Sequence, residues 1–292
     1  MPVKKDAVKK DRRQSQIGEI WRRLRVNKGA VAGLCVILLL TAMAVFAPWL
    51  APYGPNKMNA GPRLAASSLK HPLGTDSFGR DQLSRVIYGA RISLYVGFIA
   101  VGIGAVCGGF IGAVVGYYGG RIDNILMRLM DVLLAVPQTI LAIAIVGALG
   151  ANLVNLMIAV GVSQIPRYAR IVRASALSVR GQEFIEAARA IGASDLRIIV
   201  ENILPNCMAP IIVQSTLGVA SAILSAAALS FLGLGIQPPT PEWGSMLSLG
   251  RQYMRNAPHL TFYPGLIIAV VVLSLNIFGD GLRDALDPRL RQ

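Results

Sequence analysis

Long apolar stretches recur along this chain, and they decide what it can fold into. A helix needs about 20 apolar residues to cross the roughly 30 Å hydrocarbon layer of a bilayer. Six stretches approach that length, at 29–48, 92–118, 132–150, 151–166, 209–235 and 262–279. The fourth is short unless its helix continues past Pro166 into charged residues. The sequence therefore predicts an all-α integral membrane protein with six transmembrane helices.

The composition favours one membrane domain over a soluble fold. Hydrophobic residues make up 54% of the chain and charged residues only 15%, whereas soluble domains are about 25% charged. Because no long polar block interrupts the chain, we expect a single domain at 29–292 behind a basic tail at 1–28.

Lysine and arginine are distributed unevenly between alternate loops. The tail, residues 119–131, residues 167–208 and the C-terminal tail at 280–292 hold 21 of the 29 basic residues. The loops at 51–91 and 236–261 hold the other 8. Since cytoplasmic loops carry the excess of basic residues, we expect both termini and residues 167–208 in the cytoplasm, and the other two loops outside. Much of the +14 net charge lies on this cytoplasmic side, so no nucleic-acid partner is required. The basic tail either anchors the topology with little structure of its own or lies as a surface helix on anionic lipid.

The sequence offers no catalytic or metal site. Cys35, Cys107 and Cys207 lie in or beside different predicted spans, without CxxC spacing. His71 and His259 fall in the two outer loops and are best explained as ordinary surface or interface residues. No lysine follows a glycine, so a P-loop for ATP is excluded. A membrane-embedded enzyme would need a nucleophile, a metal or paired acids at one depth, and none is found.

Ion-coupled carriers usually place ionisable side chains within their spans. The candidate here is Asp131, at the start of the third span, where an ion pair with Arg128 three residues earlier is the simpler account. A self-contained ion-coupled secondary transporter therefore remains the alternative function.

The second span carries a row of glycines that indicates close helix packing. Four glycines recur at intervals of four residues, at Gly104, Gly108, Gly112 and Gly116. Small residues on one face let another backbone approach closely, which is how helices associate in lipid. The partner of this row is either another helix of the chain or a second subunit.

Polar residues in the fifth span need partners in the membrane, either other helices or water in a passage. We expect Gln214, Ser215, Ser221 and Ser225 to line a passage. Beyond this span, QPPTPEWG contains Glu242 and Trp243. These two residues either sit at the outer surface, where tryptophan suits the headgroup layer, or serve in an outer gate or a contact for a binding protein.

The segment EFIEAARAIGASDLRIIVENILPN, residues 183–206, is charged and helical between two apolar spans. Helix formers run from Glu183 to Ile191, Gly192 can take the left-handed conformation that ends a helix, and Ser194 can cap a second helix towards Pro205. The sequence therefore predicts helix, turn, helix. Within the first helix Ala187 and Ala188 present a flat patch beside the charges of Glu186 and Arg189, which suits close docking of a partner.

This segment resembles the EAA motif of permease subunits of bacterial ATP-binding-cassette (ABC) importers. That motif reads EAA, three residues, Gly, nine residues, Ile, one residue, Leu-Pro. The chain matches it at Glu186-Ala187-Ala188, Gly192 and Leu204-Pro205, but has Asn202 in the Ile position.

Three further stretches resemble the dipeptide, oligopeptide and nickel group of these permeases, most of all the dipeptide "C" permease. They are HPLGTDSFGRDQLSRVIYGARISL (71–94), SFLGLGIQPPTPEWGSML (230–247) and FGDGLRDALDPRLR (278–291). In the last, Arg283 lies between Asp280 and Asp287 at helical spacing, which favours a self-satisfied helix over a site. The resemblance covers roughly residues 20–292.

The resemblance implies a type I importer permease in the bacterial inner membrane, forming half of a passage for dipeptides, oligopeptides or a related small solute. It implies a homologous second permease, two ATPase subunits that carry the ATP and Mg²⁺, and an extracytoplasmic substrate-binding protein. This chain would then have no catalytic activity of its own. Segment 183–206 would be the coupling helix that docks on the ATPase, and the residues expected to serve there are Glu183, Glu186, Ala187, Ala188, Arg189, Gly192, Asp195, Leu204 and Pro205.

Overall fold

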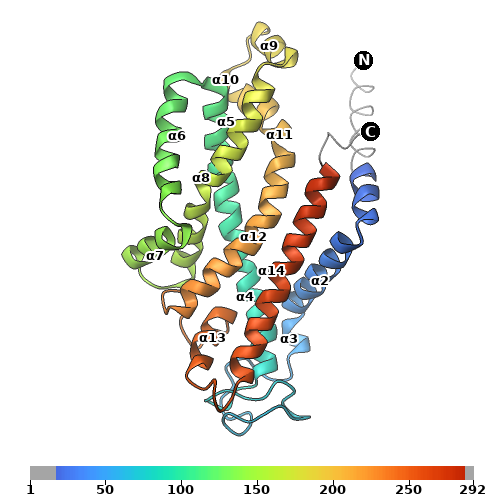
Figure 1. The fold of residues 1–292 in the computed structure, drawn as a ribbon, viewed down its shortest axis with the longest axis vertical. Coiled ribbons are helices and arrows are strands. Elements are labelled where there is room, and N and C mark those ends of the chain that lie inside the picture. The colour runs from blue at the N-terminus through green and yellow to red at the C-terminus, as the bar shows by residue number, and fades with distance from the viewer. Residues whose placement is uncertain (1–17, 287–292) are drawn as a thin grey trace.

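A computed structural model describes residues 18–286, and this part of the chain is helical, with no strand (Figure 1). The long helices are α2 (Lys28–Val45), α4 (Gln82–Ile103), α5 (Gly109–Tyr118), α6 (Gly120–Ala135), α7 (Gln138–Leu149), α8 (Leu153–Arg180), α12 (Met208–Phe231) and α14 (His259–Leu286). The short helices are α3 (Ala47–Leu50), α9 (Glu183–Ala190), α10 (Asp195–Ile198), α11 (Leu204–Asn206) and α13 (Trp243–Arg251). Two π-helical stretches, η1 (Gly104–Gly108) and η2 (Ile199–Ile203), continue α4 into α5 and α10 into α11.

Within residues 18–286, four helices are long and apolar enough to cross a membrane: α2, the continuous α4–η1–α5, α12 and α14. A fifth span is possible only if α6 and α7 count as one, and they meet at 93°. The prediction of one straight span at 132–150 is therefore wrong. Pro137 stands at the break, where its fixed φ and missing N–H prevent the helix from continuing.

The fourth predicted span, 151–166, is the first half of a longer helix. Helix α8 runs through Pro166 to Arg180, a length of roughly 42 Å at about 1.5 Å per residue. The second half of α8 contains several arginines. For this reason α8 is not among the helices apolar enough to cross a membrane, although it is long enough. The second predicted span also begins earlier, at Gln82 rather than residue 92, because Asp81 caps it by accepting a hydrogen bond from the Ser84 N–H at 2.8 Å.

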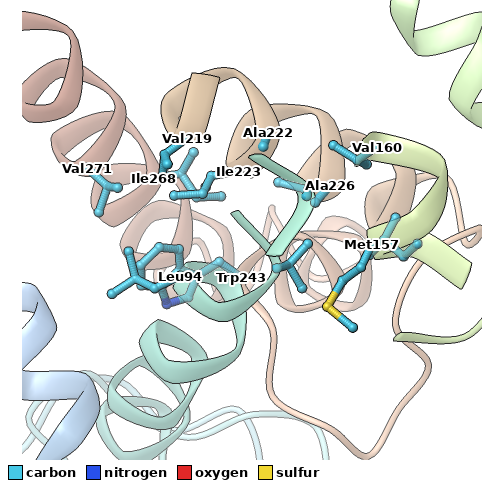
Figure 2. Close-up of a cluster of buried hydrophobic side chains, with 14 of the residues drawn as sticks. Leu94, Met157, Val160, Val219, Ala222, Ile223, Ala226, Trp243, Ile268 and Val271 are labelled. Atoms are coloured by element: carbon cyan, nitrogen blue, oxygen red, sulfur yellow. The ribbon is translucent and has the colours of Figure 1, made fainter. Parts of the chain in front are cut away.

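Helix α12 runs through the middle of the bundle and packs against α4, α8 and α14. Figure 2 shows the buried cluster around its central turns, where Ile223 lies among side chains from the neighbouring helices. The other labelled members of this cluster are Leu94, Met157, Val160, Val219, Ala222, Ala226, Trp243, Ile268 and Val271. This core fixes α12 relative to the three surrounding helices.

The two ends of the bundle differ in structure. Segment 183–206 lies at one end, together with the helical residues 18–26 and the last turns of α14 (Figure 1). The loop at 51–81 and α13 lie at the opposite end (Figure 1). The loop is tied down by buried polar pairs, Asp76 with Arg80 at 2.6 Å and His71 with Asp81 at 2.8 Å.

Candidate functional site

Segment 183–206 folds as two helices joined by a tight turn at the end of the bundle. Helix α9 ends at Ala190, and Gly192 has a φ of +78°, the left-handed conformation that glycine adopts most easily. A second helical run begins at Asp195 and widens into a π-helix at 199–203. Ser194 occupies the N-cap position with an extended backbone, but its side chain makes no capping hydrogen bond, so that detail of the prediction is wrong.

The underside of this segment is anchored by a small apolar core. Ile185, Ile198 and Ile203 are fully buried and pack with Ala113 of α5 and Val172 of α8. The segment is therefore held against the ends of two long helices.

The outer face of the segment exposes large apolar side chains. The exposed fractions are 43% for Phe184, 85% for Ile191 and 61% for Leu196, and Ala187 is also exposed. We call these four residues the loop tip. Of these four residues only Ala187 is predicted from the sequence. The spacing of 184, 187 and 191 follows one helix face and is the signal for Phe184 and Ile191, but it does not extend to Leu196.

The remaining residues expected at this site lie around the loop tip. Glu183 and Glu186 are exposed on α9, while Ala188 is half-buried against the inner core. The flat patch facing outwards is therefore centred on Ala187 rather than shared with Ala188. Leu204 packs on the inner core from α11, and Pro205 beside it is exposed.

Tyr117, at the end of α5, connects the two halves of the segment. Its hydroxyl donates a hydrogen bond to Asp195 Oδ1 at 2.6 Å and accepts one from Arg189 Nε at 3.3 Å. The Arg189 guanidinium also lies over the Tyr117 ring, 5.0 Å from its centre. The bond from Tyr117 lowers the pKa of Asp195, which keeps that carboxylate ionised. Tyr117 is not predicted from the sequence, because nothing in the local sequence marks a tyrosine that contacts residues more than 70 positions away.

The glycine row of the second span faces α8 of the same chain. A methyl group on Gly108 would lie 2.5 Å from the Ile165 carbonyl oxygen, and one on Gly116 would lie 2.5 Å from the Ala176 Cβ. Gly104 meets Gln164 and Tyr168, and Gly112 meets the backbone at 169 and 173. The absence of side chains thus brings η1 and α5 close to α8 along the row.

Two ion pairs join α6 to α8. Asp123 accepts two bonds of 2.6 Å from Arg173, and Asp131 pairs with Arg170 at 2.5 Å. The expected pairing of Asp131 with Arg128 is therefore replaced by a bond between helices. Because Asp131 is paired with Arg170, a proton relay at this position has less support.

The polar residues of α12 do not share one surface. Gln214 lines a cavity between α8, α12 and α14, whereas the Ser215 hydroxyl accepts a hydrogen bond from the Tyr168 hydroxyl at 3.3 Å. Ser221 is half-buried and Ser225 is buried. Of these four, Gln214 alone borders that cavity, and a passage lined by these residues stays a prediction.

Glu242 and Trp243 are both buried, so neither side chain offers an exposed surface to lipid or to a binding protein. The Glu242 carboxylate caps α13 by accepting bonds of 2.8 Å from the N–H groups of Gly244 and Ser245. Burial raises the pKa of Glu242, and these two bonds oppose the shift. The Trp243 indole donates to the Val86 carbonyl at 3.0 Å and packs in the core of Figure 2. Trp243 is buried because α13 folds back against α4.

The last motif, 278–291, is described only in part. Asp287 lies outside the described residues, and no ion pair joins Arg283 to Asp280 within the described part of the chain. Arg283 instead borders the same cavity as Gln214.

The described residues form a helical bundle in which several helices are long and apolar enough to cross a membrane, with an anchored and exposed segment at one end. Residues 108–292 match the family described as the inner membrane component of binding-protein-dependent transport systems, and residues 15–70 match the N-terminal transmembrane domain of oligopeptide transport permease C.

Curated relatives align over nearly the whole chain. The Pseudomonas aeruginosa di/tripeptide transport system permease protein DppC is 46% identical, over 95% of this chain and 93% of its own. The Alkalihalophilus pseudofirmus dipeptide transport system permease protein DppC is 49% identical over 94% and 90%. An Escherichia coli glutathione transport system permease protein, GsiD, is 47% identical over 97% and 94%.

Solved structures share the fold. An inward-facing form of the MetNI methionine ABC transporter matches with a TM-score of 0.55 at 19% identity, over 70% of this chain and 96% of the other. An amino acid ABC transporter matches with a TM-score of 0.51 at 18% identity, over 69% and 94%. The chain belongs to the inner membrane permease family of binding-protein-dependent ABC transporters. It is a non-catalytic membrane subunit, and its family implies an ATPase subunit and a substrate-binding protein as partners.

Proposed function

We propose that this chain forms half of the passage of an importer for dipeptides, oligopeptides or a related small solute such as glutathione. The cargo of the relatives supports the substrate class, since two transport di- or tripeptides and one transports glutathione by name. We propose the assembly expected of this family: a homologous second permease, two ATPases that carry ATP and Mg²⁺, and a binding protein on the outer side.

The proposal also assigns six spans and a cytoplasmic location to both termini and to segment 183–206. Helix α8 packs along both α4 and α5, so it extends over the same depth as a recognised span. Its Arg170 and Arg173 are paired with aspartates of α6, which lowers the cost of placing these charges in the membrane. Under this proposal α6 and α8 therefore cross the membrane with α2, α4–η1–α5, α12 and α14.

The loop tip is the observation that carries the coupling role. An exposed apolar surface on a segment that is itself anchored to α5 and α8 suits a permanent protein contact. We propose that the loop tip docks on the ATPase, with Glu183, Glu186 and Arg189 as its charged rim and with Gly192, Asp195, Leu204 and Pro205 holding its shape. Closure of the ATPases on ATP would then move α5 and α8 as rigid bodies and switch access to the passage.

The ion-coupled alternative finds less support. The candidate ionisable residue, Asp131, already has an ion-pair partner in Arg170. In the proposed importer the Asp131–Arg170 pair holds α6 and α8 together. Replacing either residue by a neutral one would lower the stability of the bundle, and transport would still be driven by ATP.

Co-purification tests the docking role. Ala187→Asp places a charge in the middle of the apolar loop tip without disturbing the inner core, and Ala151→Asp adds the same charge at an exposed site in the connection between α7 and α8. We expect tagged wild type and Ala151→Asp, extracted from membranes of the native host, to recover a second permease and P-loop ATPases. We expect Ala187→Asp to recover the permease with ATPases reduced at least about tenfold, as for a charge buried in an interface. Equal ATPase recovery from both variants would refute the loop tip as the contact.

A further inference from the structure

A cavity of about 550 Å³ opens between α8, α12 and α14. It lies towards the end of the bundle that carries segment 183–206, since its wall includes Asn206 of α11 and Arg283 near the end of α14. The volume falls in the range of roughly 300 to 1,000 Å³ that is typical of small-molecule sites. The cavity is therefore large enough for a small solute.

The charge of the cavity wall favours an anion. Arg283 is the one charged residue among the described residues that border the cavity, and no described carboxylate borders it. A guanidinium can form two parallel hydrogen bonds with a carboxylate, which gives both affinity and orientation. The strongest recognition element of the wall thus matches a carboxylate group.

The rest of the wall suits a peptide. Ser175 and Gln214 supply hydroxyl and amide groups that can bond to peptide N–H and C=O. The Asn206 amide nitrogen already donates to the Asn202 carbonyl at 2.6 Å, so this side chain offers its amide oxygen. Val213 and Leu217 supply apolar surface. A lipid headgroup would satisfy Arg283, but it would not need amide partners at several positions.

We propose that this cavity binds the C-terminal carboxylate of a peptide on its way to the cytoplasm, with Arg283 as the carboxylate-binding residue. This inference rests on the proposed function as a peptide importer. Asn206 lies directly after the Leu204-Pro205 pair, so the cavity wall and the docking segment share a stretch of chain. Movement of that segment changes the wall, which links ATPase closure to release of the carboxylate.

Photolabelling of the assembled importer tests the site. The probe is radiolabelled alanyl-photoleucine, compared with its C-terminal amide, applied without binding protein to the complex in phosphatidylcholine nanodiscs. In the wild type we expect label on peptides from α8, α12 and α14, with the free acid labelling at least about fivefold more than the amide, as for loss of a charge-assisted hydrogen bond. In Arg283→Gln we expect acid and amide to label equally weakly.

Two further variants serve as controls, one for the loss of an arginine charge and one for the volume of the cavity. Arg22→Gln removes one exposed arginine at the same end of the bundle without touching the cavity, and it should label like wild type. Ala209→Trp fills the cavity and should reduce the labelling of both probes. The comparison of the free acid with the amide is made on the wild type, so it does not depend on whether a variant folds correctly.

Four results would overturn the inference: no labelling of the cavity in wild type, equal labelling of acid and amide in wild type, unchanged discrimination in Arg283→Gln, or loss of labelling when phosphatidylglycerol is added. The last result would assign the cavity to an anionic lipid headgroup. ATP-driven uptake of labelled dialanine by wild type in vesicles, with its binding protein, is the separate check on the function. Uptake without cavity labelling refutes only this site, whereas absence of uptake refutes the peptide-importer function.

Discussion

Adding one methyl group at Gly108 should separate two helices that the glycine row holds together. An alanine Cβ there would lie 2.5 Å from the Ile165 carbonyl oxygen and 2.7 Å from the Tyr168 Cβ, in the middle of the contact with α8. Ordinary contact distances are nearer 3.5 Å, so the backbones must move apart by several tenths of an ångström or more. Overpacking of this kind costs about 1 to 3 kcal/mol, which is roughly a 5- to 150-fold shift towards the unfolded state at 25 °C.

Gly102 supplies the matched control, because it lies on α4 and a Cβ there meets nothing within 4 Å. Gly102→Ala should be neutral or slightly stabilising, since alanine is the better helix former. The assay is unfolding of the purified chain by sodium dodecyl sulfate in mixed micelles, followed by tryptophan fluorescence. If Gly108→Ala unfolds at the same detergent fraction as Gly102→Ala, the close packing of η1 on α8 is refuted.

Two further substitutions test contacts that the structure brings together. Tyr117→Phe removes the hydroxyl shared by Asp195 and Arg189 but keeps the ring under Arg189; the ATPases should still co-purify, while the ATP hydrolysed per peptide transported should rise at least twofold. The control is Tyr95→Phe, at an exposed tyrosine, which should leave the ratio of ATP hydrolysed to peptide transported unchanged. If Tyr117→Phe also leaves this ratio unchanged, the Tyr117 hydroxyl does not help to couple segment 183–206 to α5. Trp243→Ala empties a fully buried site and should destabilise the chain by about 3 to 5 kcal/mol in the micelle assay. Trp49→Ala, at a side chain that is 78% exposed, should change stability little, and equal effects would contradict the burial of Trp243.

Features that depend on local sequence were predicted well. The turn at Gly192 follows from a glycine between two runs of helix formers, and its φ of +78° agrees. The apolar runs at 29–48 and 209–235 correspond to α2 and α12 within a few residues. In these places propensity and hydropathy agree with the tertiary structure.

Features that depend on distant partners were not predicted. Hydropathy does not show that the chain turns by 93° at Pro137, or that aspartates of α6 pair with the arginines in the second half of α8. Trp243 resembles a headgroup residue by its position after a span, yet it packs against α4 because α13 folds back. The side that a polar residue faces is set by its neighbours in space, which a single sequence does not reveal.

Reconstituted uptake tests the central claim, that this chain moves solute only when ATPase subunits drive it. The assembled complex would be placed in vesicles with ATP on the ATPase side, and uptake of labelled dialanine would be measured with its binding protein, with and without ionophores that collapse ion gradients. The account predicts uptake that requires ATP and is insensitive to the ionophores. Uptake by this chain without ATPases, driven by an imposed proton or sodium gradient, would contradict it.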